Sequence, residues 1–217
     1  MTTFPGSPRL LKGGIVLLDP VSGAVQRVIA LQYNPDTLTR SLQIKGVGAE
    51  SGDRLEALRL KGPPVETFKL EAEIDATDQL EAADGQATQL GLHAVLAALE
   101  IIVYPTSAVL QANNSAASSG TLEIVAAEAP LVVFVFGPKR IAPVRFTEFS
   151  ITEEAFDPAL NPIRAKVSLS MRVMSIDDVG FDEKGGGLFM TYLQAKEQLA
   201  ALSRQGSFGM LGITGIP

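Results

Sequence analysis

Residues 150–173 decide the fold of this chain and read SITEEAFDPALNPIRAKVSLSMRV. The pattern predicts the end of a strand near residue 151, two proline-marked turns, and a second strand over residues 163–173. Successive side chains of a strand point to opposite faces, so this second strand has two chemically different faces. The apolar face holds Ile163, Ala165, Val167, Leu169, Met171 and Val173, and the polar face holds Arg164, Lys166, Ser168, Ser170 and Arg172.

A strand with one apolar face and one cationic, hydroxyl-rich face has two interpretations. In a β-barrel the polar face lines a channel or meets a neighbouring subunit. In an ordinary sandwich the same face is a solvated outer surface. The strand contains no candidate catalytic group, so either interpretation indicates a structural role for it.

The length and composition indicate one domain with appendages. A chain of 217 residues is long enough for one substantial core. We expect an N-terminal arm at residues 1–12, a β-barrel or sandwich domain at 13–176, and a C-terminal helix with a glycine-rich tail at 177–217. The residues are 46% hydrophobic and only 19% charged, whereas about 25% charged residues is usual for a soluble domain. Part of the apolar surplus is therefore expected to be buried against partner chains.

The charge and the residue counts exclude several function classes. A net charge of −6 without basic clusters argues against nucleic-acid binding. The absence of cysteine excludes disulfides, thiolate catalysis and cysteine-ligated metal sites. The apolar runs near the N-terminus and at 131–136 are too short for a signal peptide or a membrane span. We expect assembly in the cytoplasm, no membrane insertion and no cofactor.

Hydrophobic periodicity places the other elements. Strands are expected at 15–19 and 25–32 as a hairpin, at 39–47 and 65–75 as a long hairpin with a charged tip, and at 121–126, 131–136 and 141–151. Helices are expected at 88–103 and 188–204, an exposed loop at 106–120, and a flexible hinge at 185–187. The expected core contains Phe68, Leu70, Ile74, Leu96, Phe134, Phe146, Val167 and Leu169.

Catalytic chemistry finds little support in the sequence. His93 is the only histidine, and it lies in an apolar helical pattern without a second metal ligand nearby. Adjacent carboxylates do not by themselves form a general acid and base facing one cleft. A hydrolase would need a cleft that joins at least two of Asp75, Asp78, Glu153, Glu154 and His93. We therefore expect that the protein is not an enzyme.

Five segments in order resemble one family. They are PRLLKGG at 8–14, LQYNPDTL at 31–38, GPPVE at 62–66, EIDATD at 73–78 and SITEEAFDP at 150–158. Together they resemble the tube-protein N-terminal domain family of extracellular contractile injection systems, which are phage-tail-like machines. The resemblance extends from about residue 8 to residue 203.

The resemblance implies a fold and a function. The implied fold is a β-rich α+β domain: a tail-tube-like antiparallel β-barrel or sandwich with a flanking helix, a long hairpin and a C-terminal helix. The implied function is a structural one, in a homo-hexameric ring at the baseplate hub, where the inner tube meets the spike. The implied partners are the spike or hub protein, the inner tube and other baseplate proteins, in a particle that forms in the cytoplasm and can be released from the cell. Many longer members carry a C-terminal LysM domain, and here a glycine-rich tail stands in its place.

Two residue sets are predicted to make contacts in such an assembly. The candidates for a subunit interface or channel wall are Lys69, Glu71, Glu73, Arg164, Lys166 and Arg172. The candidates for docking on a partner are the apolar tail residues Phe208, Met210, Leu211, Ile213 and Ile216, because glycine-rich chain is costly to order alone. An alternative function from a different class is a monomeric β-barrel that binds a small ligand or a carbohydrate.

Overall fold

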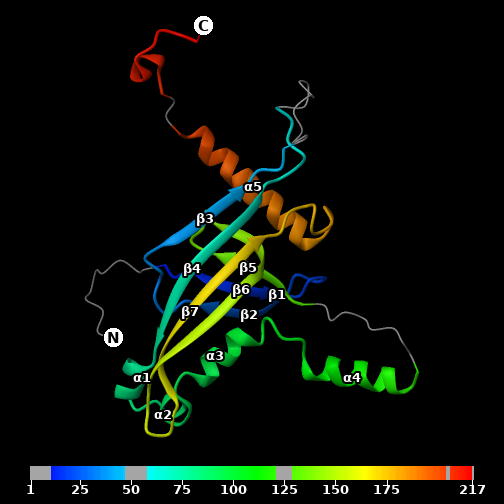
Figure 1. Cartoon of the computed structure of the whole chain (residues 1–217), viewed down its shortest axis with the longest axis vertical. Coiled ribbons are helices and arrows are strands. Elements are labelled where there is room, and N and C mark those ends of the chain that lie inside the picture. Colours follow the sequence, from blue (N-terminus) through cyan, green and yellow to red (C-terminus); the bar gives the residue numbers. More distant parts are fainter. Residues whose placement is uncertain (1–10, 47–57, 121–128, 204–205, 217) are drawn as a thin grey trace.

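The computed structural model describes residues 11–46, 58–120, 129–203 and 206–216 (Figure 1). The strands are β1 (Gly14–Leu18), β2 (Val25–Ala30), β3 (Leu38–Gln43), β4 (Val65–Asp75), β5 (Leu131–Val135), β6 (Ile141–Phe156) and β7 (Pro162–Val173). The helices are α1 (Thr77–Glu81), α2 (Gly85–Leu90), α3 (His93–Glu100), α4 (Ser107–Ser118) and α5 (Lys184–Ala201), followed by the 3-10 turn η1 (Phe208–Leu211).

All seven strands belong to one antiparallel sheet in the order β2-β1-β5-β6-β7-β4-β3. The long strands β4, β6 and β7 lie side by side, so that Val167 of β7 stands between Ala72 of β4 and Ile151 of β6. The edge strands β2 and β3 do not pair with each other, and the sheet is therefore open. The prediction of a β-rich α+β fold is confirmed, but the observed sheet is not a closed barrel.

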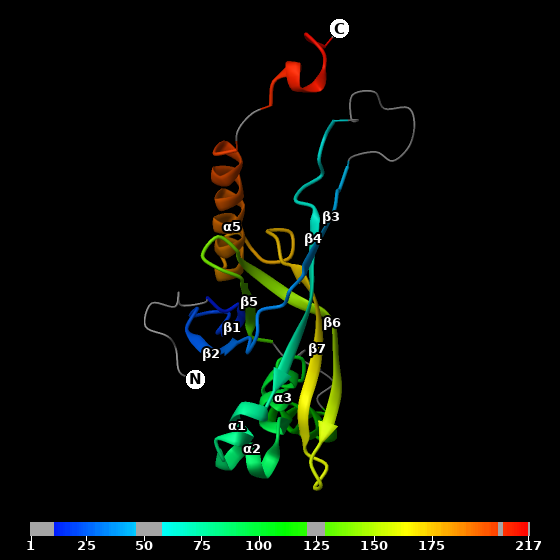
Figure 2. The ribbon, with the colours of Figure 1, turned by 90° about the vertical axis from the view of Figure 1, so that its left-hand side faces the viewer.

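The sheet folds over itself around one main core. The first residues of β6 pair with β5, and the later ones pair with β7, so that β6 crosses between the two halves of the sheet (Figure 2). The rings of Phe68 on β4 and Phe134 on β5 meet with centroids 5.3 Å apart. Leu96 of α3 and Phe189 of α5 are buried in the same cluster. One apolar core thus holds both halves of the sheet and two helices together.

The two-faced pattern of residues 163–173 is confirmed in β7. Ala165, Val167, Leu169, Met171 and Val173 are all buried, whereas Ile163 at the start of this face is only half-buried. Ser170 departs from the pattern, because it is 6% exposed although it lies on the polar face, where its hydroxyl group contacts that of Thr147. The expected core residues are buried with one exception, since Phe146 is only half-buried at the edge of the cluster.

The helix predicted over residues 88–103 is instead two helices, α2 and α3, separated at Gly91. Gly91 has a φ of 53°, and a Cβ atom at this position would lie 2.4 Å from the carbonyl oxygen of Pro162. The chain therefore turns sharply where it crosses the β6–β7 hairpin, and only glycine fits there. A hydrophobic pattern with a period of 3.6 residues runs through the break and conceals it.

Two segments predicted as flexible are helical. Residues 106–120 contain α4, which begins after Thr106, whose hydroxyl oxygen accepts a hydrogen bond from the backbone N–H of Val109. The four alanines of this helix favour helix formation more than its serine and asparagine residues oppose it. The predicted hinge at 185–187 is the first turn of α5. Gly186 lies so close to the connector that a Cβ atom would be 2.3 Å from the carbonyl oxygen of Gly180.

Some predictions fall outside the described residues. They are the strand at 121–126, most of the N-terminal arm and the tip of the β3–β4 hairpin. The paired part of that hairpin is confirmed, with Leu38 opposite Leu70 and Gln43 opposite Val65. The β1–β2 hairpin is confirmed as well.

Candidate functional site

One polar face extends across four strands. The register places Glu73 of β4, Lys166 of β7 and Thr152 of β6 in one row across the sheet. A second row contains Lys69, Ser170 and Glu148, and it continues to Thr39 on β3. We call this surface the polar face. It carries all six predicted contact residues, namely Lys69, Glu71, Glu73, Arg164, Lys166 and Arg172.

The cations of β7 on the polar face are paired within the chain. Arg164 Nε lies 2.9 Å from Asp75 Oδ2, Lys166 Nζ lies 3.4 Å from Glu154 Oε1, and Arg172 Nη2 lies 2.6 Å from Asp178 Oδ1. By contrast, Lys69 and Glu73 have no ion-pair partner among the residues that the structure describes. The Lys166–Glu154 pair is partly exposed on both sides and contributes little to stability, whereas Arg172 and Asp178 are only 23% and 19% exposed.

The middle of the polar face is a shallow depression. Hydroxyl and charged side chains line it, including Thr39, Lys69, Glu71, Ser150 and Ser168. The hydroxyl of Ser168 lies 3.4 Å from Glu71 Oε2. This surface is therefore wet and rich in hydrogen-bonding groups, although the opposite face of the same strands is the apolar core.

A buried polar cluster joins α5 to the sheet. Glu66 of β4 is only 4% exposed, and its carboxylate accepts hydrogen bonds from the hydroxyl of Tyr192 at 2.8 Å and from Lys196 Nζ at 2.5 Å. Arg40 Nε of β3 lies 3.7 Å from the same carboxylate, and Lys196 Nζ lies 4.1 Å from the centre of the Tyr192 ring. Burial and the hydrogen bond to Glu66 raise the pKa of Tyr192 well above its ordinary value.

The sequence interpretation missed this cluster, although a signal was present. Glu66 is in phase with Phe68 and Leu70, so the alternation of β4 directs it toward the core. A carboxylate at such a position needs a buried partner, and Tyr192 and Lys196 are four residues apart on the apolar stripe of α5.

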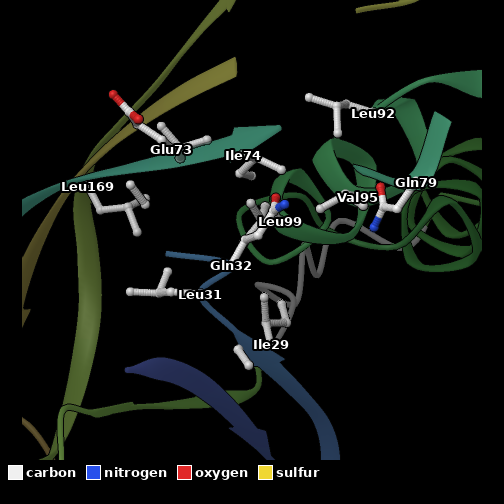
Figure 3. A pocket seen from close by; sticks show the side chains of 13 residues that line it. Ile29, Leu31, Gln32, Glu73, Ile74, Gln79, Leu92, Val95, Leu99 and Leu169 are labelled. Atoms are coloured by element: carbon white, nitrogen blue, oxygen red, sulfur yellow. The ribbon is translucent and has the colours of Figure 1, made fainter. Parts of the chain in front are cut away.

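An apolar cavity of about 160 Å³ lies at the open seam of the sheet (Figure 3). The end of β2, the second half of β4 and helix α3 surround it, and its lining includes Ile29, Leu31, Ile74, Leu92, Val95 and Leu99. Gln32 closes one side by bonding to the backbone of β4. Its Nε2 donates to the carbonyl of Asp75 at 2.7 Å, and the Asp75 N–H donates to Gln32 Oε1 at 2.9 Å. This amide pairs with β4 as the peptide group of a neighbouring strand would.

The structure does not unite the residues that a hydrolase would need. Asp75 and Glu154 lie on either side of Arg164 on the polar face, and none of the five candidates lines the apolar cavity. Hydrogen bonds from Thr77, together with the Arg164 ion pair, hold the pKa of Asp75 below its ordinary value. An ionised, paired carboxylate of this kind is a poor general acid.

The predicted docking tail lies away from the core. Phe208, Met210, Leu211, Ile213 and Ile216 are all exposed, from 44% for Ile213 to 81% for Met210. Figure 1 shows residues 206–216 beyond the end of α5, at the opposite end of the molecule from α1, α2 and α3. The tail therefore makes no contribution to the core of its own chain.

Comparison with known proteins adds no further indication of function, because neither a protein-family model nor a curated protein matches the chain. No group of three or more potential metal ligands occurs within residues 11–46, 58–120, 129–203 and 206–216. Within those same ranges, no helix combines the length and the apolar character that crossing a bilayer requires.

Proposed function

We propose that this chain is a structural component of a phage-tail-like contractile injection system. It forms a homo-hexameric ring at the junction of the baseplate hub and the inner tube, where it links the spike to the tube. The family resemblance of the five sequence segments suggests this assignment. The closed, tail-tube-like barrel is part of this proposal and not of the described structure, because the sheet of the single chain is open.

The polar face carries the proposal. A surface four strands wide, with hydroxyl groups and charges of both signs, is suited to the wall of an aqueous channel or to contact with another copy. Strand β3 at its border is a free edge among the described strands, and a free edge can pair with another chain. Lys69 and Glu73 are available for charge pairing between copies, which would set their register.

A second candidate function rests on the apolar cavity. Its volume of about 160 Å³ and its mostly apolar lining favour a small apolar molecule over a carbohydrate. In this alternative the chain is a monomer that binds a small ligand, and the polar face is a solvated outer surface. The structural function requires that assembly depends on the charges of the polar face. The ligand-binding function does not require assembly.

Lys166→Glu tests the structural function. We expect this variant to remain folded, because Lys166 is partly exposed and its ion pair with Glu154 lies at the surface. We expect it to lose incorporation into rings or particles, because the reversed charge repels the facing subunit. Ring formation is measured by light scattering and negative-stain electron microscopy, and folding is measured by circular dichroism.

The charge-swapped double variant Lys166→Glu, Glu154→Lys is the matched control. It restores the ion pair inside the chain but leaves the charge at position 166 reversed. Under the proposal, this double variant still fails to assemble. Normal assembly of the single variant, or full rescue by the swap, would show that Lys166 acts only within its own chain.

A further inference from the structure

Strand β2 is an unprotected edge. Among the described strands it pairs only with β1, so the other side of its backbone lacks a strand partner. Its apolar residues Val25 and Val28 are 62% and 64% exposed. An edge of this kind accepts an added strand from another chain, and side chains beside the edge decide which strand binds.

A shallow, open apolar groove lies beside this edge. Helix α3 supplies its second wall, and the lining includes Val28, Ile29, Ala94, Val95, Ala97 and Ile101. Arg27 is the only charged residue in the described lining. The groove adjoins the apolar cavity at the seam, because Ile29, Ala30 and Val95 border both. The site therefore combines an open strand edge, an almost uncharged wall and a hole for one larger side chain.

The chain itself contains a segment with matching chemistry. Residues 206–216 read GSFGMLGITGI and carry no charge. Their apolar side chains are exposed, and their only regular structure is the four-residue turn η1. A turn this short costs little to unwind into an extended strand. Phe208 is the only aromatic residue of the segment, and a cavity of roughly 150 Å³ is large enough to hold a benzene ring.

We propose that residues 206–216 of one copy bind the β2–α3 groove of a second copy. The segment adds as a strand to the free edge of β2, and Phe208 occupies the apolar cavity. The segment and the helices α1, α2 and α3 lie at opposite ends of the molecule (Figure 1), so the contact joins two copies head to tail. A contact between two different surfaces of the same chain builds a ring or a stack of copies.

This proposal does not depend on the injection-system function. It rests on the β2 edge, the groove, the cavity and the uncharged segment, whereas the function rests on the polar face and the sequence resemblance. Groove variants therefore test the contact between copies, and Lys166 variants test the proposed function. A negative result for one proposal leaves the other unaffected.

Disulfide trapping in the full-length chain tests the contact without interference from native thiols, since the chain has no cysteine. Val28→Cys is mixed with Met210→Cys that carries a tag of different mass, the mixture is oxidised, and the mixed dimers are followed on non-reducing gels apart from the two homodimers. We expect dimers to form at least about tenfold faster than with Thr152→Cys in place of Val28→Cys, because docking raises the local thiol concentration. Thr152 is an exposed strand residue on the polar face, and it does not line the groove.

Two further changes test the chemistry of the groove. Adding Ala97→Glu to the Val28→Cys chain places a charge in the groove, and Phe208→Ser in the Met210→Cys chain removes the anchor. We expect each change to return the rate to that of the Thr152→Cys control. Gln89→Glu adds the same charge on α2, outside the described lining, and should have no effect. Equal trapping by Val28→Cys and Thr152→Cys, or trapping that Ala97→Glu leaves unchanged, would overturn the proposal.

Discussion

Replacing Glu66 by alanine is expected to destabilise the protein by about 1–3 kcal/mol, the usual cost of leaving a buried hydrogen-bonding group without its partner. The substitution removes the acceptor for Tyr192 and Lys196 together, and both belong to α5. The Tyr192 hydroxyl would then be buried without its partner, and Lys196 would lose the charge that offsets its desolvation. The free energy of unfolding is measured by urea denaturation.

Glu71→Ala is the matched control, because Glu71 lies on the same strand but on the exposed polar face. Its removal is expected to change the free energy of unfolding by less than about 1 kcal/mol. Glu66→Gln retains an acceptor for Tyr192 but not the charge, so its effect should lie between those of the two alanine variants. If Glu66→Ala and Glu71→Ala prove equally stable, the buried cluster does not hold α5 to the sheet.

Leu169→Ala is expected to cost about 2–5 kcal/mol, the usual range for removing a buried leucine side chain. Leu169 is 3% exposed in the middle of β7, and it lies between Leu70 of β4 and Phe149 of β6. A long strand flanks β7 on each side, so the core can collapse only partly into the space that the substitution leaves. The change is measured as a loss in the free energy of unfolding.

Leu202→Ala provides the comparison for this substitution. Leu202 follows the last residues of α5 and is 80% exposed, so its truncation should have an effect within about 0.5 kcal/mol. A Leu169→Ala variant as stable as Leu202→Ala would mean that β7 turns its other face to the core.

The strands with one apolar and one polar face could be predicted from sequence, because the alternation lies in consecutive residues of a single strand. From Thr67 on in β4 and from Ile163 on in β7, apolar residues alternate with polar ones, so each face follows from the two-residue period. The pairing of β4 with β7 places Lys69, Glu71, Glu73, Arg164, Lys166 and Arg172 on one face. The long β3–β4 hairpin and most of the core were predictable for the same reason.

Other features depend on contacts between distant residues. The break at Gly91 exists because the carbonyl of Pro162 crosses there, and this contact leaves no local sequence pattern. The seam of the open sheet depends on Gln32, whose amide binds the backbone of Asp75. The β2–α3 groove is likewise formed only when residues 25–30 and 93–101 meet. Hydrophobic periodicity indicates which residues are buried, but it does not indicate which helices and strands contact each other.

Under the proposed function, the polar face belongs to a ring of identical subunits. The most direct measurement is the mass of the purified full-length chain by light scattering across a concentration series, with electron microscopy of the same sample. We expect a hexameric ring around a central channel, with the polar face of each copy at the channel wall or at a subunit contact. A chain that stays monomeric at every concentration, and remains so when mixed with its tube and spike proteins, would contradict it.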